Sequence, residues 1–570
     1  MPGKQSLKVV ICWHMHQPQY YNVGTQQYEL PWTYLHAIKD YVDMAKIIAA
    51  SPHAKAVVNF APILLEQLDD YSQQISRYLE QQTSISDPLL NALANAEISS
   101  NIEQRRHIVQ ACLKANEERL IKRFPHFEKV VTIAKQLDEI DDALVYCNEQ
   151  YFSDLLVWYH LAWLGETVRR ENIIAKTLIE KGTNYTSEDR LQLLKLIGEL
   201  LNSIIPSYKE LRENGQIELA FSPYAHPIIP LLLDVETTHE AMPEADLPHC
   251  LSYPDGKNRS LWHFSEGRKT FKHYFGFEPH GCWPSEGAIS EETLKLCNEI
   301  GISWVASGES VMRNSLEQSS TQHAFLKDGC LHRSYIYQYA DKVQCFFRDD
   351  GLSDLIGFTY SNWDADDAVN NLIHHLENIS HACSSDNDAI VPIILDGENA
   401  WEHYHENGFH FLSKLYEKLA AHPNIELTTF SQAINDKINP VVLDKIVAGS
   451  WVYGTFSTWI GDKDKNKGWD LLCEAKKTFD DVIHSGKLSE TEISLASRQL
   501  AICEGSDWFW WLGDYNSAGS VSDFENLYRL HLIELYRLLN QPAPGNLLEV
   551  LSYGGGDPEG GGSMRHGQQN

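Results

Sequence analysis

The chain has 570 residues, with 78 acidic and 47 basic side chains, and its formal net charge is −31 at pH 7. Nucleic acids and anionic membranes bind through basic patches, so this charge excludes both as main partners and fits a neutral or cationic ligand. The 43% of apolar residues is ordinary for a globular protein, and no stretch approaches the roughly eighteen apolar residues of a membrane span. The oligomeric state is left open.

The cysteines point to a reducing compartment. All eleven are scattered along the chain, and none forms a Cys-x-x-Cys pair. This pattern is typical of reduced thiols and not of a disulfide or zinc framework. The apolar run Val9–Trp13 is too short for a signal peptide and better fits a first strand. We therefore predict a cytoplasmic protein.

Short apolar runs alternate with helical periods along much of the chain. The sequence predicts strands over residues 7–13, 56–60, 215–221, 281–283, 303–306, 344–348, 390–395 and 426–429. Helices are predicted between them, over residues 34–50, 263–274, 291–300, 366–380 and 411–420. This alternation favours a parallel sheet with right-handed crossovers, and the number of strands favours a closed or nearly closed barrel.

A helical stretch of about 70–215 interrupts this alternation. Its clearest helix covers residues 186–211, where Thr186–Asp189 resembles a capping box and Leu and Ile recur at helical spacing. Pro206 falls late in that pattern and is predicted to kink or end the helix. Because the stretch is too long for a simple connection, we interpret it as an insertion.

The strand signal fades after about residue 435. Helices are predicted over residues 466–484, 489–501 and 524–539. We therefore predict a barrel domain over 1–435, a helical C-terminal domain over 436–545 packed on the barrel mouth, and a disordered tail over 546–570. The last prediction rests on the many glycine and polar residues of that stretch.

Two carboxylates follow predicted strands. Glu286 lies in Cys282–Ser290, and Asp396 follows the apolar run Ile390–Leu395. Parallel α/β folds present catalytic side chains at the carboxyl ends of their strands. Cleavage of a glycoside needs one carboxylate near the anomeric carbon and one protonated acid near the leaving oxygen, so the pair predicts a glycosidase. The alternative is that each is an ordinary acid at a helix start.

Histidines also follow the predicted strands. His14 and His16 alternate along an extended segment, so both imidazoles can reach one ligand. They can bind sugar hydroxyls, make structural hydrogen bonds or form half of a metal site. His226 follows the third strand in a similar way, and His403 lies on an aromatic segment where it binds sugar or packs.

Several other side chains have both a functional and an ordinary interpretation. Glu398 and Glu402 compete with Asp396 for its role, and they better fit a supporting role through hydrogen bonds that set its pKa. Glu218 inside a strand is either paired or solvated. The Trp451/Trp459 cluster and the segment Asp507–Trp511 are either stacking platforms for sugars or core residues.

Five short motifs together resemble glycoside hydrolase family 57, in the order of that family. They are His14–Pro18, Gly215–Glu218, Trp283–Glu286, Leu395–Asn399 and Ser450–Gly461. The resemblance covers about residues 8–540 and implies an incomplete (β/α)7 barrel followed by a helical domain. It also implies retaining action on α-glucans without a required metal or other cofactor. In this resemblance Glu286 is the nucleophile and Asp396 is the general acid/base.

Within this family, Ser222–Pro230 and Asp396–Tyr404 look most like the amylopullulanase and α-amylase branch. The expected substrate is maltodextrin, glycogen or starch with α-1,4 and possibly α-1,6 linkages. The side chains expected to bind it are His14, His16, Glu218, His226, Trp283, Glu398, Trp401, His403, Trp451, Trp459, Asp507 and Trp508.

Three alternatives remain beside this hypothesis. A 4-α-glucanotransferase or branching enzyme would share the chemistry and differ only in the acceptor. A metal-dependent carbohydrate deacetylase or mannosidase would use His14 and His16 as ligands. A non-catalytic glucan-binding protein would bind without turnover, but the presence of both carboxylates argues against it.

Overall fold

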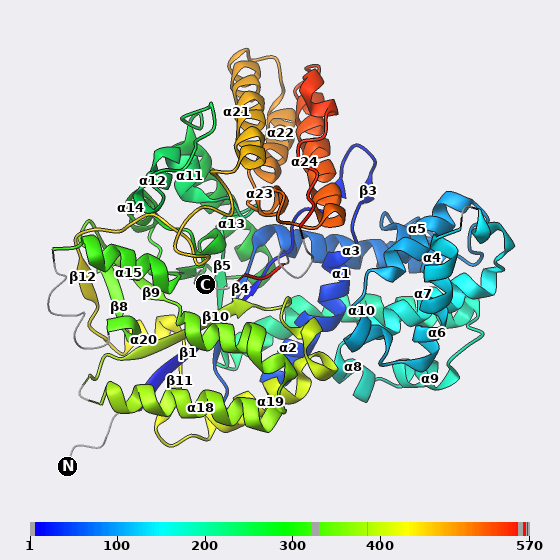
Figure 1. Ribbon diagram of the computed structural model, residues 1–570, viewed down its shortest axis with the longest axis horizontal. Coiled ribbons are helices and arrows are strands. Elements are labelled where there is room, and N and C mark those ends of the chain that lie inside the picture. Colours follow the sequence, from blue (N-terminus) through cyan, green and yellow to red (C-terminus); the bar gives the residue numbers. More distant parts are fainter. Residues whose placement is uncertain are drawn as a thin grey trace.

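The structure is a computed structural model, and it describes residues 6–140, 142–320, 330–384, 386–556, 563–565 and 567. Its centre is a curled, mainly parallel sheet with the strand order β10-β1-β4-β5-β6-β7-β9-β8-β12, and β11 pairs with the start of β1 (Figure 1). The strands are β1 (Leu7–Met15), β4 (Ala56–Phe60), β5 (Ile217–Phe221), β6 (Gly281–Cys282), β7 (Trp304–Ser307), β8 (Ser334–Tyr337), β9 (Ala340–Phe347), β10 (Ile390–Asp396), β11 (Ile425–Leu427) and β12 (Val441–Leu443).

The sheet curls so that its parallel strands come back toward one another. The backbone N–H just after β9, that of Asp349, donates to the carbonyl of Pro392 in β10 over 2.8 Å. Every residue of β1 is buried, as expected for a strand whose two faces are both covered. The predicted α/β class, with a curled parallel sheet and helices after it, is confirmed.

The first strand is longer than the sequence predicts. Its pairing continues past Trp13, because His14 lies opposite Asp396 of β10 and opposite Asn59 of β4. Polar side chains end an apolar run, but they do not end the hydrogen-bonded ladder when both neighbouring strands continue. This extension places His14 beside Asp396 at the carboxyl edge of the sheet.

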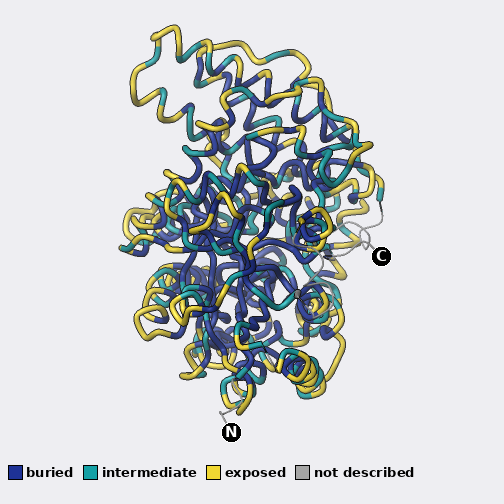
Figure 2. The backbone as a smooth tube through the Cα atoms, turned by 90° about the vertical axis from the view of Figure 1, so that its left-hand side faces the viewer, coloured by how far each residue is buried: buried dark blue, intermediate teal, exposed yellow. Residues whose placement is uncertain are grey.

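Helices cover the outside of the sheet, and the tube in Figure 2 is buried mainly along its inner strands. They are α1 (Trp32–His36), α2 (Val42–Ala49), α3 (Pro62–Gln81), α11 (Ile229–Leu233), α12 (Thr238–Ala241), α13 (Gly256–Phe275), α14 (Glu291–Glu299), α15 (Glu309–Gln318), α17 (Asp350–Asp354), α18 (Ala365–Ala382), α19 (Phe409–Ala420) and α20 (Phe430–Asn435).

The insertion forms a helical lobe beside the sheet, at the right of Figure 1. The capping box is present, since the Thr186 hydroxyl accepts from the Asp189 N–H and the Asp189 carboxylate accepts from the Thr186 N–H. The predicted end near Pro206 is wrong, because α10 continues to Glu213 and packs along α3, so tertiary packing outweighs the proline. The lobe comprises α4 (Pro88–Ala94), α5 (Ile102–Leu113), α6 (Pro125–Asp138), α7 (Glu149–Trp163), α8 (Glu166–Glu171), α9 (Ile173–Lys181) and α10 (Ser187–Glu213).

A second helical group stands on the opposite side of the sheet's carboxyl edge, at the top of Figure 1. It comprises α21 (Lys463–His484), α22 (Glu490–Cys503), α23 (Asp507–Trp511) and α24 (Ala518–Leu538). The fading strand signal after residue 435 missed β12, which has only three residues and pairs with β8. No helix in the described part of the chain is long and apolar enough to cross a membrane.

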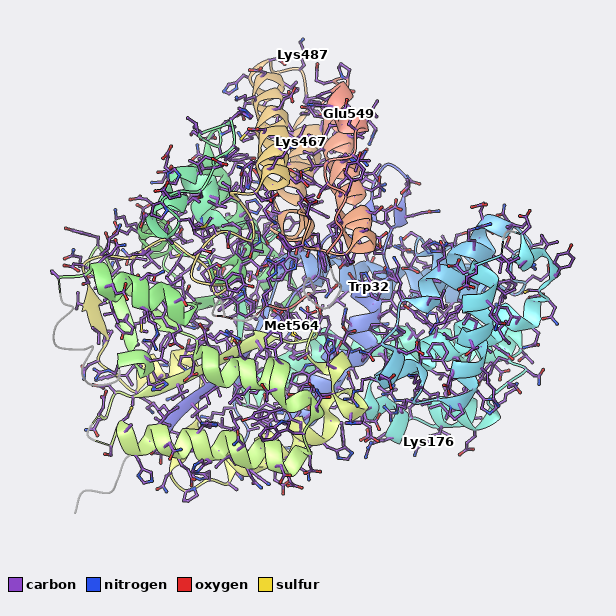
Figure 3. All side chains as sticks on the ribbon, in the orientation of Figure 1. Trp32, Lys176, Lys467, Lys487, Glu549 and Met564 are labelled. Atoms are coloured by element: carbon purple, nitrogen blue, oxygen red, sulfur yellow. The ribbon has the colours of Figure 1, made fainter. Side chains whose placement is uncertain are left out.

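The described residues of the tail make ordered contacts, although the sequence predicts disorder for this stretch. The N–H groups of Gly555 and Gly556 both donate to the carbonyl of Asn516 over 3.0 Å. Further along, Ser563, Met564, Arg565 and Gly567, here called the tail residues, return to the sheet's carboxyl edge. Figure 3 shows Met564 near the middle of the molecule, where the barrel and the two helical groups meet.

Candidate active site

A cavity of about 640 Å³ opens at the carboxyl ends of β1 and β10. The insertion contributes Lys114 and Trp163 to its wall, and the C-terminal helices contribute Trp511, Asp523 and other residues. An ion pair of 2.6 Å between Lys114 and Asp523 joins these two sides. The cavity is therefore built from three parts of the chain that are far apart in sequence.

Glu286 reaches the cavity from a tight turn after β6. Its backbone adopts the left-handed conformation, with φ 56° and ψ 25°, which costs a residue with a side chain about 1 kcal/mol or more. Trp451 holds this turn twice: its backbone N–H donates to the Glu286 carbonyl over 3.1 Å, and its indole N–H donates to the carboxylate over 3.0 Å. Strain that is held in this way is common at functional sites.

Asp396 is the last residue of β10. The side-chain amide of Asn399 donates to its carboxylate over 2.8 Å. The next residue, Gly397, lies so close to β1 that a Cβ there would come within 2.1 Å of the Met15 sulfur. Only glycine fits at that point, and its N–H donates to the His14 carbonyl over 2.7 Å. These contacts fix the direction in which Asp396 leaves the strand.

Both carboxyls are harder to ionise than in water. Burial raises the pKa of Glu286 to about 8, and the negative charge of Asp396 adds to the rise. Burial also raises the pKa of Asp396, to about 6, although Asn399, His16 and Arg348 oppose the rise. Because the two groups repel each other, they titrate as a pair, and that pair holds one proton near neutral pH.

A third carboxyl, which is buried, lies beside Asp396. One oxygen of Glu398 accepts from the His16 backbone N–H and from the Gln17 side-chain amide, each over 3.2 Å. Its other oxygen is buried and has no partner among the described residues. Burial, followed by the charge of Asp396, raises the pKa of Glu398 well above its ordinary range. The protonated form therefore prevails, and Glu398 can donate a hydrogen bond into the cavity wall.

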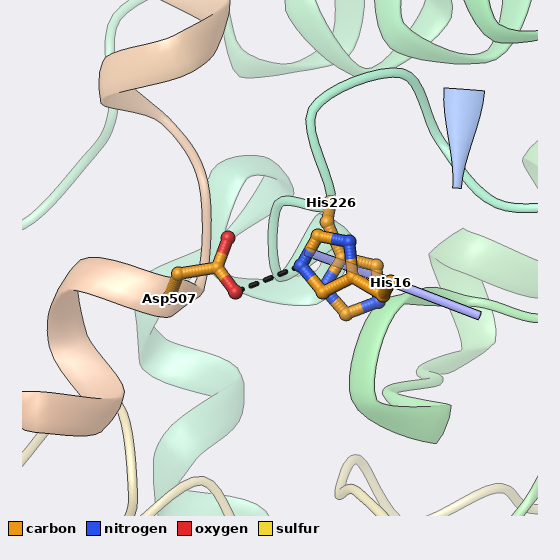
Figure 4. Close-up of side chains that lie close together, drawn as sticks. All are labelled: His16, His226 and Asp507. Atoms are coloured by element: carbon orange, nitrogen blue, oxygen red, sulfur yellow. Dashed lines mark hydrogen bonds and ion pairs between the residues drawn. The ribbon is translucent and has the colours of Figure 1, made fainter. Parts of the chain in front are cut away.

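Three imidazoles are stacked next to the carboxyls. The rings of His16 and His226 lie 3.9 Å apart, and Figure 4 shows these two rings beside Asp507. The ring of His14 lies 5.0 Å from that of His226. His16 contacts Asp507 over 2.8 Å, and the nearer carboxylate oxygen of Glu286 is 3.7 Å from His226. Burial and the neighbouring imidazoles lower the pKa of His14, to about 3, and that of His226. Both rings are therefore neutral.

Each stacked imidazole has one nitrogen free for a ligand. His14 is held through Asn59 and His226 through the hydroxyl of Ser506. The other ring nitrogens of all three histidines are buried and have no partner among the described residues. Neutral imidazoles with an open nitrogen can exchange hydrogen bonds with sugar hydroxyls. His16, His226 and Asp507 also lie close enough together to be tested as metal ligands.

The structure brings together only part of the predicted binding set. The cavity wall contains Glu286, Asp396, His14, His16, Glu398, Trp451 and Asp507, and His226 contacts it through His16. Glu218 lies at the opposite end of β5, where it accepts from the Trp304 indole over 2.7 Å. The remaining predicted residues, which do not line the cavity, are Trp283, Trp401, His403, Trp459 and Trp508.

Several wall residues were not predicted. Tyr20, Trp32, Trp163 and Phe524 add aromatic surface to the cavity, and Asn399 adds a polar group, beside Trp510, Trp511 and Glu402, which the sequence indicates as stacking or supporting residues. Asn399 lies in the same segment as Asp396, so proximity to a catalytic candidate could have identified it. Trp163 and Phe524 lie on helices whose sequence shows only amphipathic packing, and no sequence signal identifies them.

Solved structures of similar fold include enzymes of more than one activity. A GH57-type branching enzyme from Pyrococcus horikoshii matches 94% of this chain and 94% of its own, with a TM-score of 0.54 and 16% identity. An α-amylase from Thermotoga maritima matches 95% and 96%, with a TM-score of 0.57 and 13% identity. A 4-α-glucanotransferase from Thermococcus litoralis matches 94% of this chain and 60% of its own, with a TM-score of 0.51 and 13% identity. At these identities the likeness establishes the fold alone.

Sequence comparison identifies the family of the chain. A curated protein of Methanocaldococcus jannaschii, named "Putative alpha-amylase", is 23% identical over 288 residues. The match covers 49% of this chain, and it spans about half the length of that relative (52%). The model of glycosyl hydrolase family 57 matches residues 10–448, which include most of β1, both carboxyl candidates and nearly all of the barrel. The chain therefore belongs to glycosyl hydrolase family 57.

Proposed function

We propose that this protein cleaves α-glucans with retention of configuration, with Glu286 as nucleophile and Asp396 as general acid/base. The observation that carries the proposal is the pair of partly buried carboxyls, each with a raised pKa, that face one cavity from two strand ends. Titratable groups shifted by burial and by each other are typical of catalytic sites. Maltodextrin, glycogen and starch-type chains are the substrate class, in keeping with the α-amylase, branching and glucanotransferase activities of similar proteins.

The reaction has two steps. The Glu286 carboxylate attacks the anomeric carbon while Asp396 gives its proton to the leaving oxygen, so that one C–O bond forms and the glycosidic bond breaks. Asp396 then takes a proton from the incoming water or sugar hydroxyl, which attacks the anomeric carbon and releases Glu286. The first product leaves with the proton of Asp396, and the second step restores it.

The first step requires a protonated Asp396 and an ionised Glu286. In the empty cavity the two carboxyls share one proton near neutral pH, because burial raises the pKa of both. The transition state develops positive charge at the anomeric carbon, next to the attacking carboxylate. That charge favours ionised Glu286, so the proton moves to Asp396 as the substrate reacts. The imidazoles of His14, His16 and His226 would bind hydroxyls of the same sugar.

Transfer to a second sugar is the alternative to hydrolysis. The observation that favours it is the aromatic surface on both flanks of the cavity, with Trp163 on the insertion side and Trp511 and Phe524 on the C-terminal side. Such surfaces can hold an acceptor sugar by stacking and exclude water.

The free thiols of the described cysteines support the predicted cytoplasmic location, where glycogen and maltodextrin are available.

Maltoheptaose tests both versions. The purified protein is incubated with this sugar, with E286Q as control, and the products are separated by size. Only shorter sugars mean hydrolysis, and a mixture of shorter and longer sugars means transfer. The proposal is wrong if the wild-type protein forms no product, or if E286Q retains a near-normal rate.

A further inference from the structure

The tail residues lie directly behind the acid/base candidate. The carbonyl of Ser563 accepts from the Asn399 side-chain amide over 3.5 Å, and the same amide donates to Asp396 over 2.8 Å. Ser563 also lines the main cavity. A smaller adjoining pocket is lined by Asp396 and Trp451 on one side and by Ser563, Met564 and Arg565 on the other. The tail therefore forms part of the wall around Asp396.

Arg565 is held in a defined place. Its guanidinium lies 4.6 Å from the ring centres of both Trp510 and Tyr515, and one of its N–H groups donates to the Thr458 hydroxyl over 3.2 Å. A second guanidinium nitrogen is buried without a partner among the described residues. Two aromatic contacts and a hydrogen bond on one arginine make a built site and not a loose surface contact.

Gly567 fits a space that accepts no other residue. Its N–H donates to the Asp354 carboxylate over 3.1 Å, and its carbonyl accepts from the Tyr453 N–H over 3.0 Å. A Cβ at this position would lie 2.4 Å from Asp350 and 2.5 Å from Arg348, which form a buried ion pair. A larger side chain would therefore have to displace either the tail or the side chains of this ion pair, and it would do so without changing any charge.

We propose that the tail residues are a working part of the active site, in which Ser563 completes the wall beside Asp396 and Arg565 is a positioning residue. Arg565 supplies a positive charge that faces Glu286, and it influences the reaction through that carboxyl. The carbonyl of Ser563 accepts from the Asn399 side-chain amide, which orients Asp396. This inference rests on the proposed function, because a positioning role is defined by the reaction that the two carboxyls perform.

The charge of Arg565 gives the role a pH signature. Its guanidinium lowers the pKa of Glu286, against the larger upward effects of burial and Asp396. Removal of this charge raises the pKa of Glu286, so the acid limb of the profile of kcat/KM against pH moves to higher pH. The ionisable groups that face Glu286 are Asp396, Asp507, His226 and Arg565.

The test compares R565A, R565K and G567V with the wild-type protein on maltoheptaose. We expect R565A and G567V to lose about tenfold in kcat/KM at neutral pH and to shift the profile to higher pH, with R565K in between. The matched controls are R212A, which removes an arginine stacked on Phe277, and G545V, whose site has open space. The proposal is overturned if R565A and G567V keep the wild-type profile, or lose activity without a shift.

A second measurement does not depend on activity. Trypsin cleaves after Arg565 only when the tail residues have dissociated from the barrel. The rate at which the C-terminal peptide is released, measured by mass spectrometry, therefore shows how often the tail is undocked. We expect slow cleavage in the wild type and fast cleavage in G567V, with G545V like the wild type. Equal rates in wild type and G567V would overturn the docking itself. A docked tail on a protein that is inactive toward maltoheptaose would instead contradict the proposed function.

Discussion

Two glutamates in this protein have opposite surroundings. Glu504, at the end of α22, accepts hydrogen bonds from Arg259 over 2.7 Å and from Tyr253 over 2.5 Å, and it contacts His263 over 2.8 Å. Burial alone would raise its pKa, but Arg259 and His263 lower it to about 2. Glu286 is partly buried and has an indole and another carboxyl nearby, and its pKa rises to about 8.

The difference separates a structural acid from a reactive one. Glu504 follows α22 of the C-terminal helices, and its partners Arg259 and His263 lie on α13, so this cluster ties that group to the barrel. The charge of Glu504 is fully compensated, and no proton needs to move there. Among the residues that the structure describes, Glu286 has no direct ion pair of this kind and Arg565 offsets its charge only in part, so that charge is available to a developing positive centre on a ligand. Burial by itself therefore identifies neither role, whereas the partner does.

Substitution of the catalytic pair should have the largest effect. We expect E286Q and D396N to lower turnover of maltoheptaose by at least about 10³-fold, because each removes a group that forms or breaks a bond. The matched control is E402Q, which changes another carboxyl in the cavity wall and should stay within about tenfold of the wild type.

Azide separates the two roles of the pair. With an activated aryl glycoside, azide should restore turnover in E286A with inverted configuration and in D396A with retained configuration. NMR of the glycosyl azide reads the configuration directly. The opposite assignment of the two products would exchange the roles of Glu286 and Asp396.

Substitution of the structural acid should affect stability instead. In E504Q the Arg259 guanidinium stays buried without its counter-charge, and we expect a loss of about 3–5 kcal/mol in the free energy of unfolding. Urea unfolding followed by circular dichroism measures this loss. The kcat of the folded fraction should be unchanged, and an E504Q variant with wild-type stability would show that the cluster does not hold the two parts together.

The sequence predicted the centre of the site better than its walls. Glu286 and Asp396 could be predicted because each follows an apolar strand, and parallel strands present their carboxyl ends on one edge. His14 and His16 followed from the same rule. The left-handed backbone of Glu286 could not be predicted, since it depends on the two hydrogen bonds from Trp451, more than 150 residues away in the chain.

The walls depend on packing between distant segments. Trp163 and Phe524 come from helices whose apolar faces predict burial but not the partner, and Ser563 comes from a polar segment that predicts no structure at all. Glu218 was misleading for a different reason. It entered the expected binding set with its motif, although it lies near the start of β5 and not at the carboxyl end. The register with β4, where Glu218 lies opposite Val57, agrees with that position.

The raised pKa of Glu286 predicts a gain in stability when its carboxyl is replaced. The native state favours the protonated form, so the contribution of Glu286 is full below pH 4.5 and is lost as pH rises through about 8. E286Q has no proton to lose and should be more stable than the wild type by on the order of 1–3 kcal/mol at pH 9 and by little at pH 5. Thermal unfolding at both pH values measures this, and a destabilised E286Q at pH 9 would contradict it.

A chelator should have the smallest effect, which is no change in activity. His16, His226 and Asp507 have ligand atoms within 4.8 Å of one another, the arrangement that a metal-dependent enzyme would use. A metal must lie in the plane of each imidazole that binds it, about 2.0–2.1 Å from nitrogen. The planes of His16 and His226 are stacked 3.9 Å apart and inclined by only 23°, so they do not meet at that distance. Asp507 already engages His16 over 2.8 Å. We therefore expect activity on maltoheptaose to survive dialysis against EDTA, and added Zn²⁺ not to raise it. A loss on dialysis that Zn²⁺ reverses would make these imidazoles metal ligands and remove their role in binding sugar hydroxyls.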